Sequence, residues 1–289
     1  MNPAKARQVT RQSKVIPGWF SPEASMLFAW IDEIQQRNNI EGDCFEIGCH
    51  HGKSAVLLAS IVNPLKEKLA VCDLFGMQAD NVSRSGSGDL QAFNRNMQPL
   101  RDDGVEINIF QKNSAQLTTA EIGNTYRIFH VDGGHNPDEA LTDLRLAADC
   151  TVEGGAIVLD DPFRMEWPGV TEALIRFLDE RPEFQAIMTG FNKLVLTREK
   201  RSGLYLAALD SSTQRETFGF SYPWRVKEMP FHRTVLRVFY VPDYLQRKSI
   251  GNLARWVYNK SDLLAGSRKK RAALKAIKSS RISLSLIHI

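Results

Sequence analysis

The sequence lacks the features of disulfide-stapled, membrane-spanning and repeat proteins. Its four cysteines, Cys44, Cys49, Cys72 and Cys150, form no C-x-x-C pair. No apolar run is long enough to span a bilayer, no signal-peptide core is present, and no internal repeat is evident. We therefore expect reduced, buried thiols in a cytoplasmic protein.

Positive and negative residues are also nearly balanced in number over most of the chain. The net charge of +4 comes from an excess of Lys and Arg between Arg247 and Arg281, so the part before it is close to neutral. This balance gives no reason to expect a nucleic-acid partner. The basic segment could contact an acidic membrane surface, but we favour its interpretation as a solvated, disordered tail.

Residues 44–54 have the pattern of a strand, a glycine-bounded turn and a helix start. A Walker A loop needs four residues between its first glycine and Gly-Lys-Ser/Thr, whereas only Cys49, His50 and His51 separate the two glycines here. The first glycine pair of the dinucleotide fingerprint is also missing. What remains is a tight loop that presents backbone N–H groups at a helix N-terminus to a ligand.

Acidic residues stand at the ends of four predicted strands. The strands are predicted over Cys44–Ile47, Leu69–Cys72, Arg127–Val131 and Ala156–Leu159. Their acids are Glu46, Asp73, Asp132, and the pair Asp160 and Asp161. In an open α/β sheet the carboxyl ends of parallel strands form one edge, and ligands bind there. We therefore predict a ligand site at this edge.

Alternating strand and helix patterns predict an α/β fold with a Rossmann-like, doubly wound and mostly parallel sheet. Val105–Gln111 supplies a further strand. Phe184–Met188 and Lys193–Thr197 are joined by turn-forming residues and are predicted to form a C-terminal antiparallel hairpin.

The chain is predicted to have four parts. They are a disordered N-terminal segment over 1–20, the α/β domain over 21–200, an extension over 201–260 that packs on this domain, and a basic tail over 261–289. In the extension, Leu204–Leu209 and Val235–Val241 are predicted to be strands. Ser283–Ile289 resembles a translated sequencing adapter, so these last residues are interpreted as non-native.

The acids of the second half of the sheet point to two kinds of chemistry. Asp132, Asp160 and Asp161 would repel one another where they converge unless a cation such as Mg²⁺ or Mn²⁺ neutralises them. The alternative is that the last two cap the following loop. His135 could remove a hydroxyl proton as a general base, and a His that only hydrogen-bonds within its turn is the alternative.

Several segments together resemble one branch of the class I S-adenosylmethionine-dependent methyltransferases, the methyltransferase-24 type. They are Phe45–Ser54, Asp73–Gly76, Ser85–Asp89, Val131–His135, Leu159–Pro162, Trp167–Val170 and Asn192–Leu194. The resemblance covers roughly residues 40–200 and implies the class I fold with S-adenosylmethionine as cofactor. Related sugar O-methyltransferases depend on Mg²⁺ held by acids at the same strand ends. They tend to carry a second acid two residues after the first, where this chain has Gly134.

The resemblance also implies roles for individual residues. The predicted cofactor-binding residues are Glu46, Gly48, His51, Gly52, Asp73, Ser114 and Asp132. The predicted catalytic residues are His135 and Asp132, and the predicted metal ligands are Asp132, Asp160 and Asp161.

The leading hypothesis is an O-methyltransferase that acts on a hydroxyl group of a sugar or another small polar metabolite. Two alternatives stay open. One is a nicotinamide-dependent (NAD) oxidoreductase on a Rossmann sheet, and the other is a non-catalytic binding protein built on a methyltransferase domain, which Gly134 allows. The sequence specifies neither the acceptor nor the oligomeric state.

Overall fold

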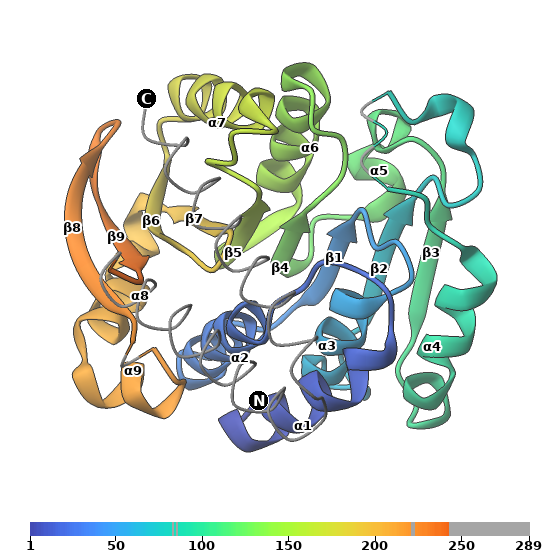
Figure 1. Ribbon diagram of the computed structural model, residues 1–289, viewed down its shortest axis with the longest axis horizontal. Coiled ribbons are helices and arrows are strands. Elements are labelled where there is room, and N and C mark those ends of the chain that lie inside the picture. The colour runs from blue at the N-terminus through green and yellow to red at the C-terminus, as the bar shows by residue number, and fades with distance from the viewer. Residues whose placement is uncertain (83, 85, 221–222, 243–289) are drawn as a thin grey trace, which may run out of the picture. The chain divides into compact units, whose positions relative to one another are not determined.

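The computed structural model of the protein describes residues 1–82, 84, 86–220 and 223–242 (Figure 1). The chain divides into two units, the larger of which comprises Met1–Tyr222 and Val226–Phe239. The described part of the smaller unit is limited to residues 223–225 and 240–242. The predicted basic tail and the end of the predicted extension lie outside the described residues.

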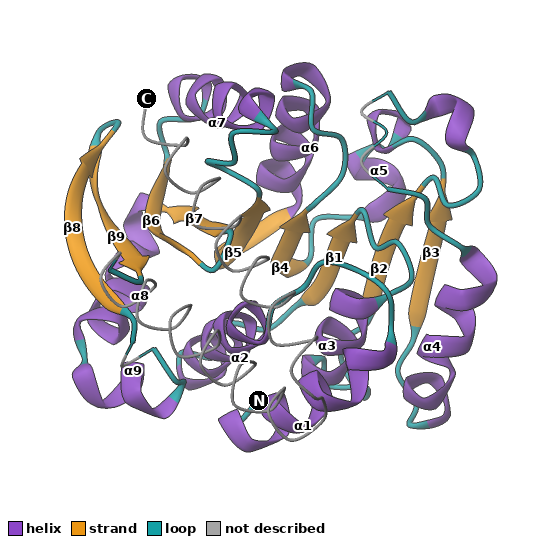
Figure 2. Ribbon diagram, in the orientation of Figure 1, coloured by secondary structure: helices purple, strands orange, loops and turns teal. Residues whose placement is uncertain are grey.

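The strands form one sheet in the order β3-β2-β1-β4-β5-β7-β6-β9-β8 (Figure 2). Their bounds are β1 Asp43–Ile47, β2 Leu69–Asp73, β3 Ile107–Gln111, β4 Tyr126–Val131, β5 Thr151–Asp160, β6 Phe184–Gly190, β7 Lys193–Arg198, β8 Arg225–Phe231 and β9 Thr234–Tyr240. Strands β1 to β5 pair in parallel, and β7 pairs antiparallel with both β5 and β6. The predicted mostly parallel α/β sheet with a late antiparallel hairpin is confirmed.

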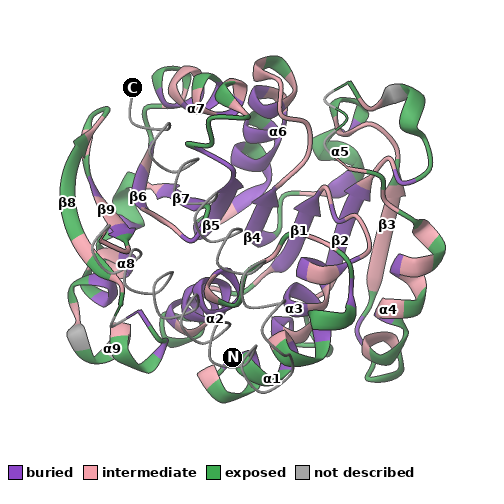
Figure 3. Cartoon of the chain, in the orientation of Figure 1, coloured by how far each residue is buried: buried purple, intermediate pink, exposed green. Residues whose placement is uncertain are grey.

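Helices cover both faces of this sheet. They are α1 Pro3–Gln12, α2 Pro22–Arg37, α3 Lys53–Ile61, α4 Leu90–Asp102, α5 Thr119–Ile122, α6 Pro137–Cys150, α7 Pro168–Glu180, α8 Glu199–Asp210 and α9 Ser212–Thr217. Figure 1 shows α6 and α7 on one face and α2 and α3 on the other. Strands β1 and β4 are therefore buried along their whole length (Figure 3), as expected for parallel strands covered on both sides. Among the described residues, no helix combines the length and apolar character needed to cross a bilayer.

Two helix starts follow the predicted cap chemistry. The Ser21 hydroxyl accepts a hydrogen bond from the Ala24 N–H at 3.0 Å and opens α2. The Asn136 side chain accepts one from the Glu139 N–H at 2.9 Å and opens α6. Each cap precedes a proline in the first turn, where the missing N–H has no cost.

Two local predictions differ from the structure. Residues 3–12 of the segment predicted to be disordered form α1, because Asn2 caps the helix and Ala6 and Val9 are buried. Leu204–Leu209, predicted to be a strand, lies within α8. The buried residues Ser202, Tyr205 and Leu209 recur at helical spacing, which overrides the strand propensity of the run.

The β6–β7 hairpin has a turn of only two residues, Phe191 and Asn192. Both have positive φ, 58° and 63°, as a type I′ turn requires. The turn sets the register of β7, so that its first residue, Lys193, lies opposite Asp160 at the carboxyl end of β5. A cation is thereby placed at the edge that carries the acids.

A buried ion cluster ties α2 to the centre of the sheet. Arg127 of β4 is 2% exposed, and its guanidinium pairs with Glu67 at 2.9 Å and with Asp32 at 2.8 Å. It also donates to the Gln35 side chain at 2.9 Å. The guanidinium thus neutralises Glu67 and shares Asp32 with the N-terminal ammonium of Met1, which pairs with the other oxygen of Asp32.

We expect Arg127→Met to lower the free energy of unfolding by about 3–5 kcal/mol, because Glu67 stays buried without a countercharge and Asp32 keeps only the Met1 ammonium. Urea unfolding measures this loss. The matched control is Arg145→Met, since Arg145 is half-exposed and pairs with the similarly exposed Glu180 at 2.7 Å. The control should cost less than about 1 kcal/mol. Equal losses in the two variants would contradict the prediction.

Candidate active site

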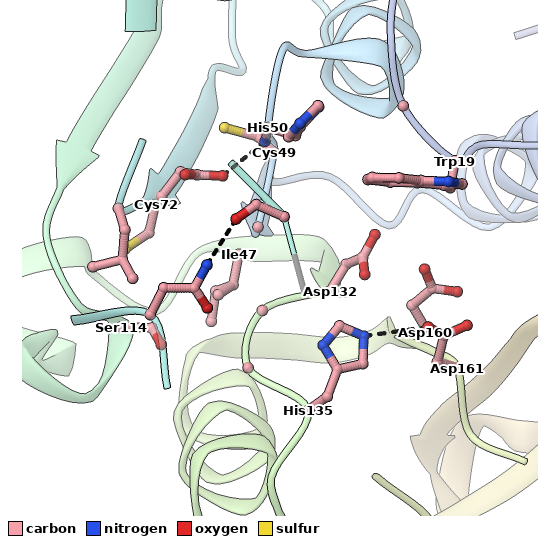
Figure 4. A pocket seen from close by; sticks show the side chains of 18 of the residues that line it. Trp19, Ile47, Cys49, His50, Cys72, Ser114, Asp132, His135, Asp160 and Asp161 are labelled. Carbon is pink, nitrogen blue, oxygen red and sulfur yellow. Dashed lines mark hydrogen bonds and ion pairs between the residues drawn. The ribbon is translucent and has the colours of Figure 1, made fainter. Parts of the chain in front are cut away.

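A pocket of about 340 Å³ opens at the carboxyl ends of the parallel strands. The turns after β1, β2, β3, β4 and β5 and residues 17–20 all contribute to its wall. Figure 4 shows Cys49, Cys72 and Ser114 on one side of the pocket, His135, Asp160 and Asp161 on the other, and Asp132 between them. The predicted site at this edge of the sheet therefore corresponds to a real cavity.

The turn after β1 requires glycine at its first position. Gly48 has φ of 82°, and a Cβ atom there would lie 1.7 Å from the carbonyl oxygen of Asp132. The backbone can thus pass directly beneath the β4 turn only without a side chain. Gly48 lines the pocket, and α3 begins a few residues later with its N-terminus near this wall.

Asp73, at the end of β2, holds the neighbouring turns in place. One carboxylate oxygen accepts from the His50 N–H at 2.7 Å and the other from the Phe75 N–H at 2.5 Å. Burial raises the pKa of Asp73, and these two N–H groups partly offset the effect. Asp73 lines the pocket as predicted, and its oxygens retain lone pairs for further donors.

The structure places three predicted cofactor residues away from the pocket wall. Glu46 is fully buried, and its Oε1 accepts a hydrogen bond from Nδ1 of His130 at 2.7 Å. Its side chain points into the sheet–helix interface because it alternates with Ile47, which does line the pocket. His51 and Gly52 are also absent from the wall, where His50 lies instead.

The N-terminal segment supplies a wall that the sequence prediction missed. Trp19 is 76% exposed and its ring lies 5.6 Å from that of His50. Lys53 donates to the carbonyl oxygen of Gly18 at 2.8 Å and so fixes the segment to α3. The basic, polar composition of residues 1–15 gave no signal of this role.

Ser114 follows β3 and lines the pocket as predicted. Behind it, Asp143 of α6 is 1% exposed, and neither of its oxygens has a partner with full hydrogen-bond geometry among the described residues. Burial raises the pKa of Asp143 to about 7, and the nearby Ser114 hydroxyl offsets this only in part. An unpaired carboxyl group therefore lies directly below this end of the pocket.

The acids after β4 and β5 separate into two groups rather than converging. Asp160 accepts from the Lys193 ammonium at 2.5 Å and from the Asn192 amide at 3.1 Å. Asp132 is partly buried and lines the pocket. Burial and the neighbouring Asp160 raise the pKa of Asp132 well above its usual range, although Lys193 opposes the shift.

Asp161 belongs to the second group and pairs with His135. Its Oδ2 lies 3.2 Å from Nε2 of His135, and its Oδ1 accepts from the Asn192 amide. Burial alone would raise the pKa of Asp161, but hydrogen bonds from His135 and Asn192 outweigh burial and lower it. The carboxylate therefore stays charged and accepts from the Nε2–H group of His135. The ring of His135 packs 4.4 Å from that of Trp167.

This pairing leaves Nδ1 of His135 as the nitrogen with a lone pair. It has no hydrogen-bond partner among the described residues. A neutral imidazole whose one N–H is fixed by a carboxylate presents its other nitrogen as a base. In this structure Nδ1 of His135 is itself buried, so the nitrogen without a partner is not open to the pocket.

The presence of glycine at position 134 is explained by Glu139, which the sequence analysis treated only as part of a helix start. A Cβ atom at position 134 would lie 2.2 Å from Oε2 of Glu139. Glu139 lines the pocket, and burial raises its pKa. A carboxyl group therefore occupies the space beside Gly134, although it comes from α6.

The predicted metal ligands do not form one group. Among the described residues, the set that could hold an ion is His130, Asp132 and Asp160, whose ligand atoms lie within 4.8 Å of one another. Asp161 is not part of this set, and Lys193 already binds Asp160. The three aspartates as they lie do not fit the magnesium site that the sequence predicts.

We expect Asp143→Asn to stabilise the protein at high pH. The folded-state pKa lies above the usual carboxyl value, so folding favours the protonated form. The stability of the wild type must then fall as pH rises from about 4 to about 7, by as much as about 4 kcal/mol. Urea unfolding should show a large gain for Asp143→Asn at pH 8 and little gain at pH 4.

The control for this measurement is Asp149→Asn on the same helix, where the side chain is 51% exposed. It should change the stability by less than about 1 kcal/mol at both pH values. A gain for Asp143→Asn that does not depend on pH would show that the carboxyl group is not the titrating group.

Comparison with known proteins agrees with this geometry. The methyltransferase-24 family, described as a methyltransferase domain, matches residues 45–162. The solved structure of the O-methyltransferase NovP is similar at 15% identity, with a TM-score of 0.50, over 63% of this chain and 83% of NovP.

Two further structures are similar at lower TM-scores. One is the calicheamicin TDP-rhamnose 3′-O-methyltransferase CalS11, with 13% identity, a TM-score of 0.45, and coverage of 68% of this chain and 92% of that one. The other is the O-methyltransferase TomG from Streptomyces achromogenes, solved with S-adenosylmethionine, with 18% identity, a TM-score of 0.44, and coverage of 67% and 87%. Structures this distant in sequence inform on the fold alone. No curated protein matches the chain.

Proposed function

Residues 45–162 match the methyltransferase-24 family, and from this premise we propose what the chain does. We propose that it transfers a methyl group from S-adenosylmethionine to a hydroxyl oxygen. The acceptor in this proposal is a sugar or another small polar metabolite. The observation that carries the proposal is that the turn after β1 and the His135–Asp161 pair open into one cavity. A cofactor on the first side and a hydroxyl on the second would meet there.

The first half of the sheet would hold the cofactor. Backbone N–H groups near the start of α3 face the pocket beside Gly48 and suit the charged amino-acid end of the ligand. Asp73 has free lone pairs for ribose hydroxyls. Ser114 and the buried Asp143 lie at the end of the pocket where the adenine ring of the cofactor would be placed.

The second half would perform proton removal. The acceptor oxygen attacks the methyl carbon, the carbon–sulfur bond breaks, and the sulfonium becomes the neutral thioether of S-adenosylhomocysteine. The hydroxyl proton would pass to the imidazole of His135, which lines the pocket and is held by Asp161. Apart from this step, the protein would contribute mainly by orienting the two substrates.

Magnesium has no step in this mechanism, since the three aspartates do not converge on one position. The second carboxyl group that the family resemblance leads one to expect near Asp132 would come from Glu139, whose carboxylate fills the space beside Gly134. Glu139 would bind an acceptor hydroxyl rather than replace His135.

We propose a cytoplasmic location on the evidence of the thiols. Cys44, Cys49, Cys72 and Cys150 are all free and buried. Burial raises the pKa of Cys150 to about 11 and that of Cys44 to about 12, so neither is a reactive thiolate at neutral pH. The described structure thus has no disulfide that would need an oxidising compartment in order to form.

Calorimetry tests the cofactor. S-adenosylmethionine and S-adenosylhomocysteine should both bind with one site per chain, and NAD should not. Asp73→Asn should weaken S-adenosylhomocysteine binding roughly 10- to 100-fold, because a charged hydrogen bond to the ribose is lost. The control Asp103→Asn changes an exposed acid and should bind as the wild type does. Failure of the wild type to bind either sulfur nucleoside would refute the proposed function.

Turnover measurements test whether His135 is the general base. The release of S-adenosylhomocysteine is measured with a panel of sugars and other polyols. His135→Gln should lower kcat roughly 100- to 10,000-fold and leave S-adenosylhomocysteine affinity unchanged. His232→Gln is a matched control, because His232 is similarly buried and pairs with Asp179 at 2.9 Å outside the pocket. If His135→Gln retained full kcat, another group would have to take the proton.

A further inference from the structure

A buried ammonium group that the proposed reaction does not use pairs with Asp160 of the pocket wall. Lys193 is 2% exposed, and its Nζ lies 2.5 Å from Oδ1 of Asp160. The same Nζ lies 5.5 Å from the centre of the Phe20 ring, which covers it. Lysine is rarely buried unless it is paired, so this position needs an explanation.

The side chains around this lysine form most of a cation site. A ring nitrogen of His130, together with oxygens of Asp132 and Asp160, forms the group whose ligand atoms lie within 4.8 Å of one another. His130 is fully buried, and its Nε2 has no hydrogen-bond partner among the described residues. Its other ring nitrogen donates to Glu46 at 2.7 Å. A carboxylate that holds a histidine in this way is a common support for a metal ligand.

The ammonium competes with any metal for this group. Asp160 sits opposite Lys193 across the β5–β7 pairing, so the strand register itself delivers the positive charge to this carboxylate. A divalent ion bound by the same oxygens would lie within a few ångströms of the ammonium. Repulsion between two cations is strong where water is excluded. Lys193 cannot move away easily, because its backbone lies within the sheet.

We infer that Lys193 takes the place of a divalent cation between Asp132 and Asp160, and that methyl transfer in this pocket needs no metal. The inference rests on the proposed function, since it concerns the same pocket. Lys193 acts as a positioning residue that neutralises and fixes the two acids. An acceptor hydroxyl would then bind to these carboxylates directly.

This assignment also accounts for the separation of the adjacent acids. Asp160 is committed to Lys193, which leaves Asp161 to orient His135. Asn192 donates to both aspartates and keeps them apart.

Binding of Mn²⁺ tests the inference without knowledge of the acceptor. The full chain, loaded with S-adenosylhomocysteine, is titrated with Mn²⁺, and free Mn²⁺ is measured by electron paramagnetic resonance. The wild type should show no saturable site up to millimolar Mn²⁺. Lys193→Met should gain one site per chain at least tenfold tighter, and adding Asp160→Asn should remove it. Lys193→Arg, which keeps the charge, should behave as the wild type.

The control is Lys112→Met, because Lys112 lines the pocket but pairs with Glu121 at 2.7 Å, away from Asp132 and Asp160. It should not gain an Mn²⁺ site. Stoichiometric Mn²⁺ binding by the wild type that Asp160→Asn abolishes would overturn the inference. So would a Lys193→Met variant that binds S-adenosylhomocysteine but no Mn²⁺.

These outcomes are separate from the test of the proposed function. The wild-type titration needs no variant and decides the question even if Lys193→Met does not fold. Loss of S-adenosylhomocysteine binding in the wild type would count against the methyltransferase proposal alone. Once an acceptor is found, equal turnover in excess chelator and in Mg²⁺ is the expected result.

Discussion

The need to neutralise acids at one edge of a buried sheet governs the architecture of this pocket. A carboxylate that is removed from water without a partner destabilises the fold by several kcal/mol. In this protein four of the acids at this edge are held by side chains or backbone N–H groups of neighbouring strands and turns. The pairs are Glu46 with His130, Asp73 with two backbone N–H groups, Asp160 with Lys193, and Asp161 with His135. The partners link adjacent strands and turns, so the same contacts that neutralise the acids also fix the pocket wall.

These pairs differ in what they leave available for chemistry. Asp73 uses backbone donors and keeps lone pairs that face the cavity, which suits a neutral hydroxyl ligand. Asp161 fixes the ring of His135, whose other nitrogen is buried and has no hydrogen-bond partner among the described residues. Asp160 is saturated by Lys193 and Asn192 and has little capacity for a metal. In the proposed function, one edge of the sheet would thus provide separate places for a nucleoside, a proton and an acceptor.

The sequence was sufficient for the fold and for the location of the pocket. Strand positions follow from apolar runs, the helix starts at Ser21 and Asn136 follow from cap chemistry, and the acids mark the carboxyl edge. It was not sufficient for side-chain direction. Glu46 and Ile47 are adjacent, and only the register of the sheet decides that the second of them faces the cavity. His51 was preferred to His50 for the same reason.

Contacts between distant segments were the other limit. His130 was read only as part of an apolar strand, yet it faces Glu46 because β1 and β4 pair in register. Lys193 stood in a stretch that resembled the family, but its role depends on an antiparallel pairing with β5 that local patterns do not encode. Trp19 reaches the pocket from a segment whose composition predicted disorder. In each case the decisive information is a long-range pairing rather than a local motif.

Gly134 illustrates how a missing group can be replaced in three dimensions. In the sequence alone, Gly134 stands where related enzymes carry an acid. For this reason a non-catalytic binding protein stayed among the alternatives. In the fold, Oε2 of Glu139 lies where a side chain at position 134 would begin, so the local negative charge is retained from one turn into α6. A glycine is then the only residue compatible with that placement, because any Cβ would collide with the carboxylate. The departure from the family pattern is therefore better explained as a relocation of the acid than as a loss of chemistry.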